Sequence, residues 1–149
     1  YYTIGSLCQS DKCLVNSKED LSKIIFGKTS FEDSLLISGW SVGEAESRWA
    51  EGKQSSLKLV NNKEKTKIII EALTLKEPQT VEVSIDGGLV DSFSSTSEFK
   101  TYSVALNRPL SQGLHTLVFT YSNTYKPSEI SQSADNRELS VNFKQIRLE

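Results

Sequence analysis

The fold class is decided by the stretch TVEVSIDGG, residues 80–88. Val81, Val83 and Ile85 alternate with polar residues, which is the period-two pattern of a strand with one buried face. The Asp-Gly-Gly triplet at 86–88 follows, and both residue types tolerate the positive φ angles of a tight turn. The stretch therefore predicts an antiparallel hairpin in which residues 89–93 return as the second strand.

Short runs of the same alternating kind lie on both sides of this hairpin, separated by Gly, Asn, Asp, Ser and Pro. Eight or nine short strands with turn signals about every 8–12 residues are typical of a β-sandwich. Connections of unequal length, with no internal repeat, favour a jelly roll. The expected fold is therefore all-β, a jelly-roll-like (galactose-binding-like) β-sandwich. The other predicted strands are Ser34–Trp40, Arg48–Ala50, Ser56–Val60, Lys67–Leu75, Tyr102–Leu106, Leu117–Tyr121 and Leu139–Leu148.

The last of these strands changes phase near its middle. Alternate apolar residues from Leu139 to Phe143 share one face, whereas Ile146 and Leu148 have the opposite parity. Keeping all of them on one buried face requires an extra residue near Lys144, which predicts a β-bulge. A bend that carries the strand into the other sheet is the alternative.

One short helix is expected near the N-terminus. In residues 17–26, three apolar side chains recur at spacings of three and four, Ser17 can cap the first turn, and Gly27 can end the helix. The chain is therefore expected to comprise an N-terminal extension, residues 1–33, and a β-sandwich domain, residues 34–149.

The composition excludes several classes of function. The 149 residues carry a net charge of −2, whereas a general nucleic-acid binder needs a basic face, so no nucleic-acid partner is expected. One His and two Cys form no zinc-ligand motif, and we expect no metal and no other cofactor. The longest apolar runs, such as Ile68–Ile70, are far shorter than the ~20 residues that span a bilayer. Because the chain begins at Tyr1 and contains no Met, we expect it to belong to a longer protein.

The two cysteines, Cys8 and Cys13, enclose four residues near the N-terminus. This spacing suits a small disulfide loop in an oxidising compartment, and two free thiols in a reducing cytosol are the alternative. There is no Asn-x-Ser/Thr sequon. A bacterial periplasm or cell surface fits both observations.

The residues give little support for catalysis. His115 shares strand parity with Leu117 and lies in no nucleophile motif, so we expect a structural role for it. A glycosidase pair or a calcium loop would need carboxylates at a distinctive spacing, and none stands out. No catalytic residue is therefore assigned. The carboxylates considered are Glu44, Glu46, Asp86, Asp91 and Asp135.

The two tryptophans give a stronger signal. Trp40 and Trp49 lie nine positions apart, with Glu44 and Arg48 between them. Exposed indoles can stack on the apolar faces of sugar rings while polar neighbours bind the hydroxyls; buried indoles would instead anchor the core with their N–H groups bonded to backbone. Arg48 could equally form an ion pair with Glu44 or Asp135.

The longest irregular stretch is Ser122–Asn136, which carries Tyr125 and Asp135. Loops longer than about 12–15 residues in a compact domain are usually functional or mobile. We therefore include this loop among the candidate binding regions.

Three stretches carry short motifs in a specific order: residues 39–49, 78–87 and 133–143. They resemble a family of C-terminal domains, of unknown function, in bacterial membrane glycosyltransferases and phosphoglycerol-transferase-like proteins. Residues 39–49, GWSVGEAESRW, resemble the family's GWS-x-x-E…RW opening. Residues 78–87 are similar to its middle, with Asp-Gly in place of the usual Asn-Gly turn. Residues 133–143 resemble its S-x-D-x-R-x-L-G close, although Ser140 stands where Gly is usual. The resemblance covers about residues 36–148.

The resemblance implies a β-sandwich attached to a multi-span membrane enzyme and facing the periplasm. It also implies that any transferase chemistry belongs to the membrane-embedded part of the parent protein. The matched residues either contact a glycan or form a structural charge cluster in which Asp135 and Arg137 pair with Glu44 and Arg48. The family pattern maps onto Trp40, Glu44, Arg48, Trp49, Asp135 and Arg137.

Together these observations predict a non-catalytic accessory domain that binds or positions a carbohydrate or lipid-linked sugar for its parent enzyme. The alternative is a structural or protein-interaction domain that packs against the parent membrane protein through an exposed apolar patch. An enzyme would need an acid/base set clustered in a pocket. The candidate ligand-binding residues are Trp40, Glu44, Arg48, Trp49, Tyr125, Asp135 and Arg137.

Overall fold

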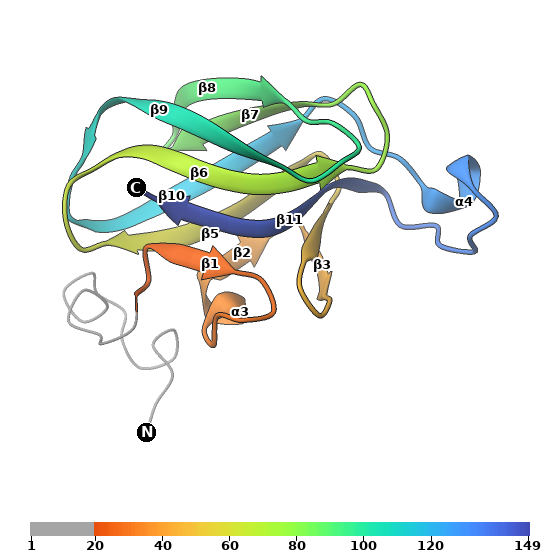
Figure 1. Ribbon diagram of the computed structural model, residues 1–149, viewed down its shortest axis with the longest axis horizontal. Coiled ribbons are helices and arrows are strands. Elements are labelled where there is room, and N and C mark those ends of the chain that lie inside the picture. Colours follow the sequence, from red (N-terminus) through yellow and green to blue (C-terminus); the bar gives the residue numbers. More distant parts are fainter. Residues whose placement is uncertain (1–19) are drawn as a thin grey trace.

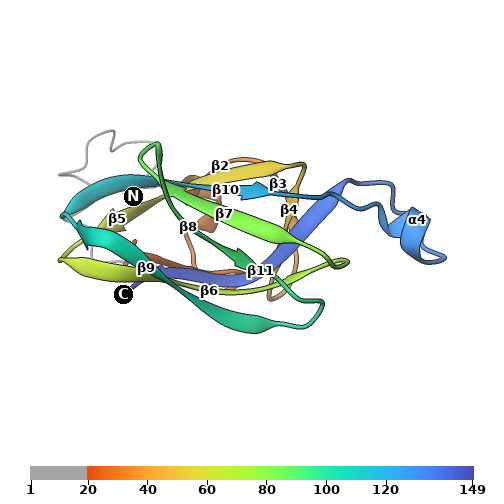
Figure 2. The same ribbon diagram turned by 90° about the horizontal axis from the view of Figure 1, so that it is seen from above.

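The computed structural model describes residues 20–149, which form two antiparallel β-sheets packed face to face (Figure 1). Figure 2 shows the two layers from above, with the α4 segment projecting from one end. The predicted all-β, jelly-roll-like sandwich is confirmed. The predicted Cys8–Cys13 loop lies outside the described residues. No helix in residues 20–149 is long and apolar enough to cross a membrane.

The first sheet has six strands. Five follow the order β3-β4-β11-β6-β9, and β1 pairs with the C-terminal part of β11, on the same edge as β4. The second has five strands in the order β2-β5-β10-β7-β8. Two one-turn helices, α3 (Glu32–Leu35) and α4 (Pro127–Ile130), lie in the connections. The strands are β1 (Lys23–Ile25), β2 (Leu36–Ser38), β3 (Trp40–Gly43), β4 (Arg48–Glu51), β5 (Gln54–Asn61), β6 (Lys65–Thr74), β7 (Thr80–Ile85), β8 (Gly88–Ser94), β9 (Lys100–Leu110), β10 (Gly113–Tyr121) and β11 (Leu139–Leu148).

The hydrophobic core fills the space between the two sheets. Alternate side chains of the central strands β6, β10 and β11 point into it, as the period of two along a strand requires. Each large apolar side chain buried there contributes about 1.5–3 kcal/mol. The largest fully buried side chains are Phe26, Phe119, Phe143, Ile24, Leu35, Leu57, Leu59, Ile68, Ile70, Leu117, Leu139 and Ile146.

Two local predictions are confirmed. The β7–β8 hairpin turns through Asp86 (φ 51°) and Gly87 (φ 87°), as a tight turn with two positive φ angles requires. The register of β11 against β6 shifts between Phe143 and Gln145, which is the predicted bulge. The extra residue lets Phe143 and Ile146 both face the core despite their opposite parity.

The prediction of a helix over residues 17–26 is wrong where the structure describes it. Residues Lys23–Ile25 form β1, in which Ile24 is paired with Ile146 of β11. The three-residue strand buries Ile24 and leaves Ile25 37% exposed, which is an alternating pattern. The backbone bonds to β11 outweigh the local helical spacing. The sandwich therefore begins before residue 34, and the expected domain boundary falls inside it.

The strand predicted at Ser34–Trp40 is two strands in different sheets. β2 pairs with β5 in the second sheet, whereas β3 pairs with β4 in the first. The chain crosses between them at Gly39, whose φ is +80°. A Cβ atom at Gly39 would lie 2.0 Å from the carbonyl oxygen of Gln54. Glycine is therefore required at this crossing.

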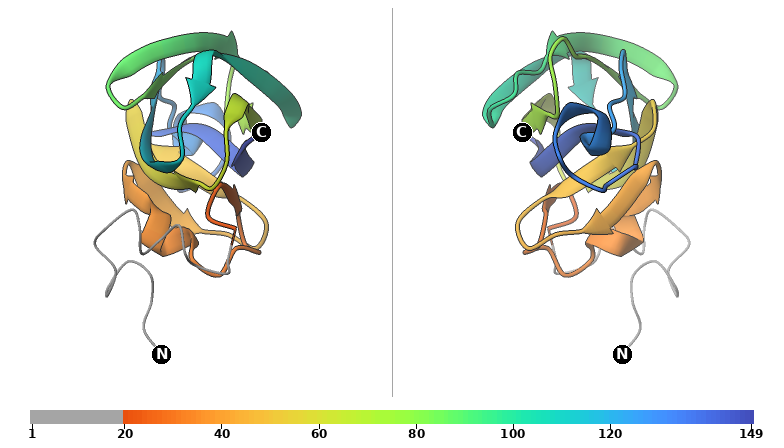
Figure 3. Two further views of the ribbon diagram at one scale, coloured as in Figure 1. Left: turned by 90° about the vertical axis from the view of Figure 1, so that its left-hand side faces the viewer. Right: turned by 90° about the vertical axis from the view of Figure 1, so that its right-hand side faces the viewer.

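The sandwich has two different edges, which Figure 3 shows end-on. At one edge lie β8 and β9, the outermost strands of the second and first sheets. At the opposite edge lie the outermost strands β2 and β3, with α3 beside them. The outer faces of the sheets and these two edges are the surfaces on which a site can form.

Candidate functional site

Trp40 is part of the packing between the sheets. Its ring centroid lies 5.6 Å from that of Phe26 and 5.5 Å from that of Phe143. The indole Nε1–H donates a 2.8 Å hydrogen bond to the carbonyl oxygen of Ser56. The ring and its polar group are therefore both engaged within the protein, as in a core anchor.

Trp49 points the other way. It is next to Ala50, which is completely buried, and successive side chains of a strand point to opposite faces. Trp49 is half-buried and is not part of the core cluster. It is paired with Asn142 of β11, which in turn is paired with Leu73 of β6. The tryptophan pair of the sequence is thus divided between the core and the outer face of the six-stranded sheet.

Phe99, just before β9, extends this row of side chains. Its ring lies 4.3 Å below the Lys144 Nζ atom, a cation–π distance that places both side chains on the outer face. Strands are spaced about 4.8 Å apart, so a row across β4, β11, β6 and β9 spans about 14 Å. We call this surface the outer-face platform; it consists of Trp49, Leu73, Phe99, Asn142 and Lys144.

The amide of Asn142 sits at the centre of the platform. Asn142 is 7% exposed, and its Oδ1 atom has no hydrogen-bond partner among residues 20–149. A buried acceptor without a partner destabilises the fold, because its lost hydration is not replaced. The platform therefore has one polar group whose bonding capacity is unused.

A hollow of about 300 Å³ adjoins the platform on the same face. Glu71 accepts a 3.1 Å hydrogen bond from the Nε2 atom of Gln145, and both side chains line the hollow. The hollow offers both donors and acceptors beside the apolar row. Its lining residues are Ile25, Phe26, Lys28, Glu46, Glu71, Lys144 and Gln145.

The outer face of the five-stranded sheet is different. Cross-strand pairs such as Thr116–Lys58 and Val118–Ser56 cover it with small or polar side chains. In the part of the chain that the structure describes, this face carries no aromatic residue. The asymmetry marks the six-stranded sheet as the face with binding potential. Leu73, Phe99, Asn142 and Lys144 were not among the residues predicted from the sequence. Only their parity along the strands could have indicated that they share a face.

The predicted ion pairs of Arg48 are wrong. Its Nη1 atom lies 3.0 Å from Asp33 Oδ1 and its Nε atom 3.7 Å from Glu32 Oε2, so it holds α3 against β4. Arg48 therefore pairs with neither Glu44 nor Asp135. Glu44 is exposed in the turn between β3 and β4, where its backbone N–H bonds to the Ser47 carbonyl.

Asp135 and Arg137 pair with each other instead of joining a larger charge cluster. The Arg137 Nε atom donates 3.0 Å hydrogen bonds to both Asp135 oxygens, and Nη1 donates a 2.6 Å bond to Ser41 Oγ. Hydrogen bonding from Arg137 lowers the pKa of Asp135 to about 2. The pair fastens the loop before β11 to β3, which is a structural role.

Tyr125 also has partners within the protein. Its hydroxyl donates a 2.7 Å hydrogen bond to the Pro78 carbonyl, and its backbone forms a bridge to Leu139. The structure thus places Tyr125 and Asp135 in the same loop but brings neither to Trp49. Among residues 20–149, no group of three or more His, Cys, Asp or Glu side chains is placed to hold a metal ion.

Comparison with known proteins supports the fold. No family model matches the chain, and no curated protein matches it. A family two carbohydrate esterase from Clostridium thermocellum, in complex with cellohexaose, matches 77% of the chain with a TM-score of 0.52 and 14% identity. An acetyl xylan esterase from Butyrivibrio proteoclasticus matches 88% with a TM-score of 0.54 and 11% identity. The chain spans only 30% and 32% of the lengths of these two esterases.

A third solved structure is similar over nearly its whole length. It is a variant of a family 29 carbohydrate-binding module, and 84% of this chain matches 90% of that module with a TM-score of 0.50 and 10% identity. Identities this low establish the fold alone. The chain therefore has the β-sandwich fold of carbohydrate-binding modules.

Proposed function

We propose that this domain is a non-catalytic carbohydrate-binding module that binds glycan on its outer-face platform. One observation carries the proposal: Trp49 and Phe99 are aromatic residues that the core does not use, and both lie on the outer face of the same sheet. The opposite sheet offers no comparable surface within the described residues.

The platform has the two kinds of groups that sugar recognition needs. A pyranose ring presents an apolar C–H face that can pack on an indole or phenyl ring, and its hydroxyls need donors and acceptors at the margin. Trp49 and Phe99 supply the rings, Lys144 supplies a donor, and Glu71 and Gln145 of the adjoining hollow supply further polar groups. The span of about 14 Å suits several sugar units better than one.

Glycan binding is tested by titration calorimetry with cellohexaose, the ligand of the similar esterase, after a survey of soluble glycans has identified any better ligand. We expect Trp49→Ala and Phe99→Ala each to weaken binding about tenfold or more, since loss of a stacked ring costs about 1–3 kcal/mol. Val118→Ala, on the outer face of the five-stranded sheet, is the control and should bind like the wild type.

Circular dichroism establishes that each variant is folded before its binding is compared. The proposal is refuted if no glycan binds the wild type. It is also refuted if folded Trp49→Ala and Phe99→Ala variants bind as tightly as the Val118→Ala control.

We further propose that the domain is an accessory part of a membrane-bound glycosyltransferase or phosphoglycerol-transferase-like protein, on the periplasmic or outer side of a bacterial membrane. The motifs at residues 39–49, 78–87 and 133–143 support this proposal by their resemblance to such proteins. In that setting the module would position a carbohydrate or lipid-linked sugar for its parent. The test is the reading frame around this sequence, which should encode multiple membrane spans; a frame without them contradicts the proposal.

A second function is favoured by the edge opposite β8 and β9. Ile37 of β2 is 53% exposed and Val42 of β3 is 75% exposed, on strands that are the outermost of their sheets. Exposed apolar side chains on edge strands, which have one side without a strand partner among the described residues, suit contact with another protein surface, such as the parent's membrane-embedded part. Ile37→Lys and Val42→Lys should then abolish that association in a pull-down with the parent. Glycan binding, measured by titration calorimetry, should be unchanged.

A further inference from the structure

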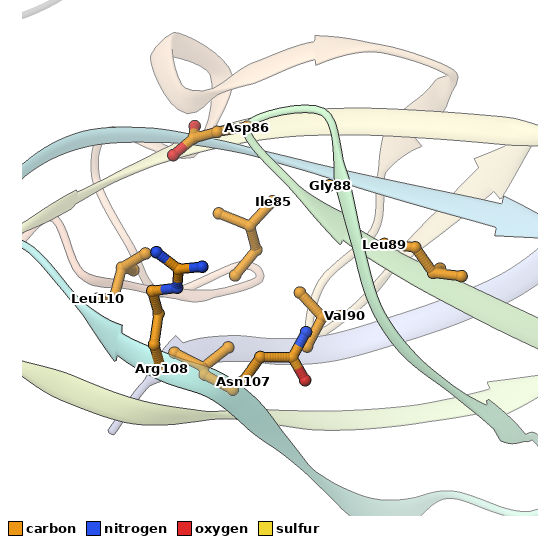
Figure 4. Close-up of a pocket in the computed structure, with 9 residues that line it drawn as sticks. Ile85, Asp86, Gly88, Leu89, Val90, Asn107, Arg108 and Leu110 are labelled. Atoms are coloured by element: carbon orange, nitrogen blue, oxygen red, sulfur yellow. The ribbon is translucent and has the colours of Figure 1, made fainter.

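The hydrophobic core is not closed at the edge formed by β8 and β9. Four apolar side chains that pack against the core, Ile85, Val90, Leu106 and Leu110, are only partly buried. They line a cavity of about 460 Å³ between the hairpin turn and the second half of β9 (Figure 4). This volume is in the range of small-molecule sites, about 300–1,000 Å³.

The stacked rings of Phe93 and Tyr102 close the core farther along this edge. Their centroids are 4.4 Å apart and their planes differ by 23°, so they bridge β8 and β9. Toward the hairpin turn no such aromatic pair spans the two strands among the described residues. The cavity is therefore a local interruption of the packing, with apolar walls on both sheets.

One cationic group enters this cavity. Figure 4 shows the Arg108 guanidinium directed into the space bounded by Ile85, Val90 and Leu110. Within residues 20–149, no carboxylate lies within 4.0 Å of the Arg108 nitrogens. The cation thus keeps its hydrogen-bonding capacity for a ligand.

The acidic residue that lines the cavity, Asp86, is already hydrogen-bonded within the protein. Its Oδ2 atom is 2.6 Å from the His115 Nδ1 atom, and its Oδ1 atom accepts a 2.9 Å hydrogen bond from the Thr116 N–H. Asn107, next to Arg108 on β9 and across the cavity from Asp86, adds a neutral amide. The cavity therefore combines one amide, apolar walls and one guanidinium that has no carboxylate partner among residues 20–149.

We propose that this edge cavity binds an anionic amphiphile, with its carboxylate or phosphate head on Arg108 and its alkyl chain against Val90, Leu106 and Leu110. A guanidinium matches the geometry of both head groups and can bind either through two parallel hydrogen bonds. The alkyl chain would cover the apolar walls that the two sheets leave exposed. This site is separate from the outer-face platform, so the result of the glycan-binding experiment does not affect this proposal.

The cavity is a poor match for other ligand classes. It presents no flat aromatic ring, on which a sugar would stack, among its lining residues. A single arginine is too little charge for a nucleic acid, whose affinity comes from many phosphate contacts. An alkyl chain with one anionic head uses both the guanidinium and the apolar walls of the cavity.

The test uses three eight-carbon probes with the full chain: octanoate, octyl phosphate and 1-octanol. Binding is followed by the amide chemical shifts of Val90, Leu106 and Asn107 in ¹⁵N–¹H NMR spectra. We expect saturable shifts with one or both anionic probes, and about tenfold weaker binding of neutral 1-octanol, because a hydrogen bond to a charged group contributes about 1.5–3 kcal/mol. The comparison of octanoate with octyl phosphate shows whether a fatty acid or a phosphate head is preferred.

Two variants test the assigned roles. Arg108→Gln should weaken the anionic probes about tenfold and leave 1-octanol unchanged. Val90→Phe, which fills the cavity, should weaken all three probes. The control is Arg147→Gln, since Arg147 lies on β11, which β6 separates from β9, and bonds to Glu149 and Gln145.

The proposal is overturned by any of three results. The first is an absence of saturable shifts with both anionic probes at millimolar concentration. The second is equal binding of octanoate by the wild type and a folded Arg108→Gln variant. The third is a set of shifts centred on the outer-face platform instead of on β8 and β9.

Discussion

His115 and Asp86, which are 29 residues apart in the chain, meet through a 2.6 Å contact between Nδ1 and Oδ2. The other ring nitrogen, Nε2, is 2.8 Å from the Ser111 carbonyl oxygen. His115 is 8% exposed and lies on β10, whereas Asp86 lies in the β7–β8 turn. The pair therefore ties the turn that opens β8 to the centre of the five-stranded sheet, and His115 has the structural role that its sequence context predicts.

Asp86→Ala should destabilise the protein by about 1–3 kcal/mol. The substitution leaves buried His115 without one partner and removes the acceptor of the Thr116 N–H. It also places alanine at a φ of 51°, a left-handed backbone conformation that Asp adopts more readily than Ala. Urea unfolding measures the loss, and Asp91→Ala, in the adjacent strand β8, is the control. An equal effect of the two substitutions would show that the His115 contact contributes nothing.

The two tryptophans should respond differently to truncation. Trp40→Ala removes a ring packed on Phe26 and Phe143 and should cost about 3–5 kcal/mol. Trp49→Ala removes a half-buried ring from the outer face and should cost about 1 kcal/mol or less. Urea unfolding of both variants makes the comparison. If Trp49→Ala is the more damaging change, Trp49 is a packing residue and the outer-face platform loses its main support.

Much of the fold could be predicted because the signals that specify it are local. The alternation at residues 80–85 and the Asp-Gly turn predict the β7–β8 hairpin, and the parity change within 139–148 predicts the bulge. Each of these features depends on neighbouring residues in one stretch of chain. The same is true of His115, whose parity with Leu117 predicts burial.

The failures depend on contacts that are distant in the sequence. The spacing of Leu21, Ile24 and Ile25 is helical, yet backbone bonding of Lys23–Ile25 to β11, more than 100 residues away, makes a strand. Which sheet β2 and β3 join is decided by their partners, not by their own residues. Leu73 and Phe99 could not be predicted as neighbours of Trp49 for the same reason. The three side chains come together only when β4, β11, β6 and β9 are placed side by side.

Insertion of one alanine between Gln145 and Ile146 tests the register that the bulge sets. One more residue at this point would turn Ile146 and Leu148 to the solvent face if the pairing from Leu139 to Gln145 is kept. Exposing two large buried side chains should cost about 3–6 kcal/mol in the free energy of unfolding, measured by urea unfolding. The control is deletion of Lys144, which joins Phe143 directly to Gln145, leaves both side chains facing the core and should cost less than the insertion. An insertion variant as stable as the deletion variant would mean that the register is not fixed at this point.

The ionisation of Asp135 should follow its contact with Arg137. Because hydrogen bonding lowers the pKa of this carboxyl from the ordinary 3.8 to about 2, the ionised form stabilises the folded protein above about pH 4. That contribution is lost as the pH falls from about 4 to about 2. The ¹³C shift of the Asp135 carboxyl carbon should titrate with a midpoint near 2, and Arg137→Gln should raise the midpoint toward 3.8. A wild-type midpoint near 3.8 would contradict the contact.

Alanine should be tolerated less well at Gly39, in the crossing between the two sheets, than at Gly52, in the turn between β4 and β5. Gly39 and Gly52 both have positive φ, +80° and +89°. A Cβ at Gly39 would lie 2.0 Å from the Gln54 carbonyl oxygen, whereas a Cβ at Gly52 would meet no atom within 4 Å. Gly52→Ala should therefore cost only the backbone strain, about 1–2 kcal/mol, and Gly39→Ala should cost more because β2 and β5 must also separate. Thermal unfolding of the two variants measures the difference. Equal costs would show that the chain can move aside at Gly39, and that this crossing is less constrained than its backbone geometry implies.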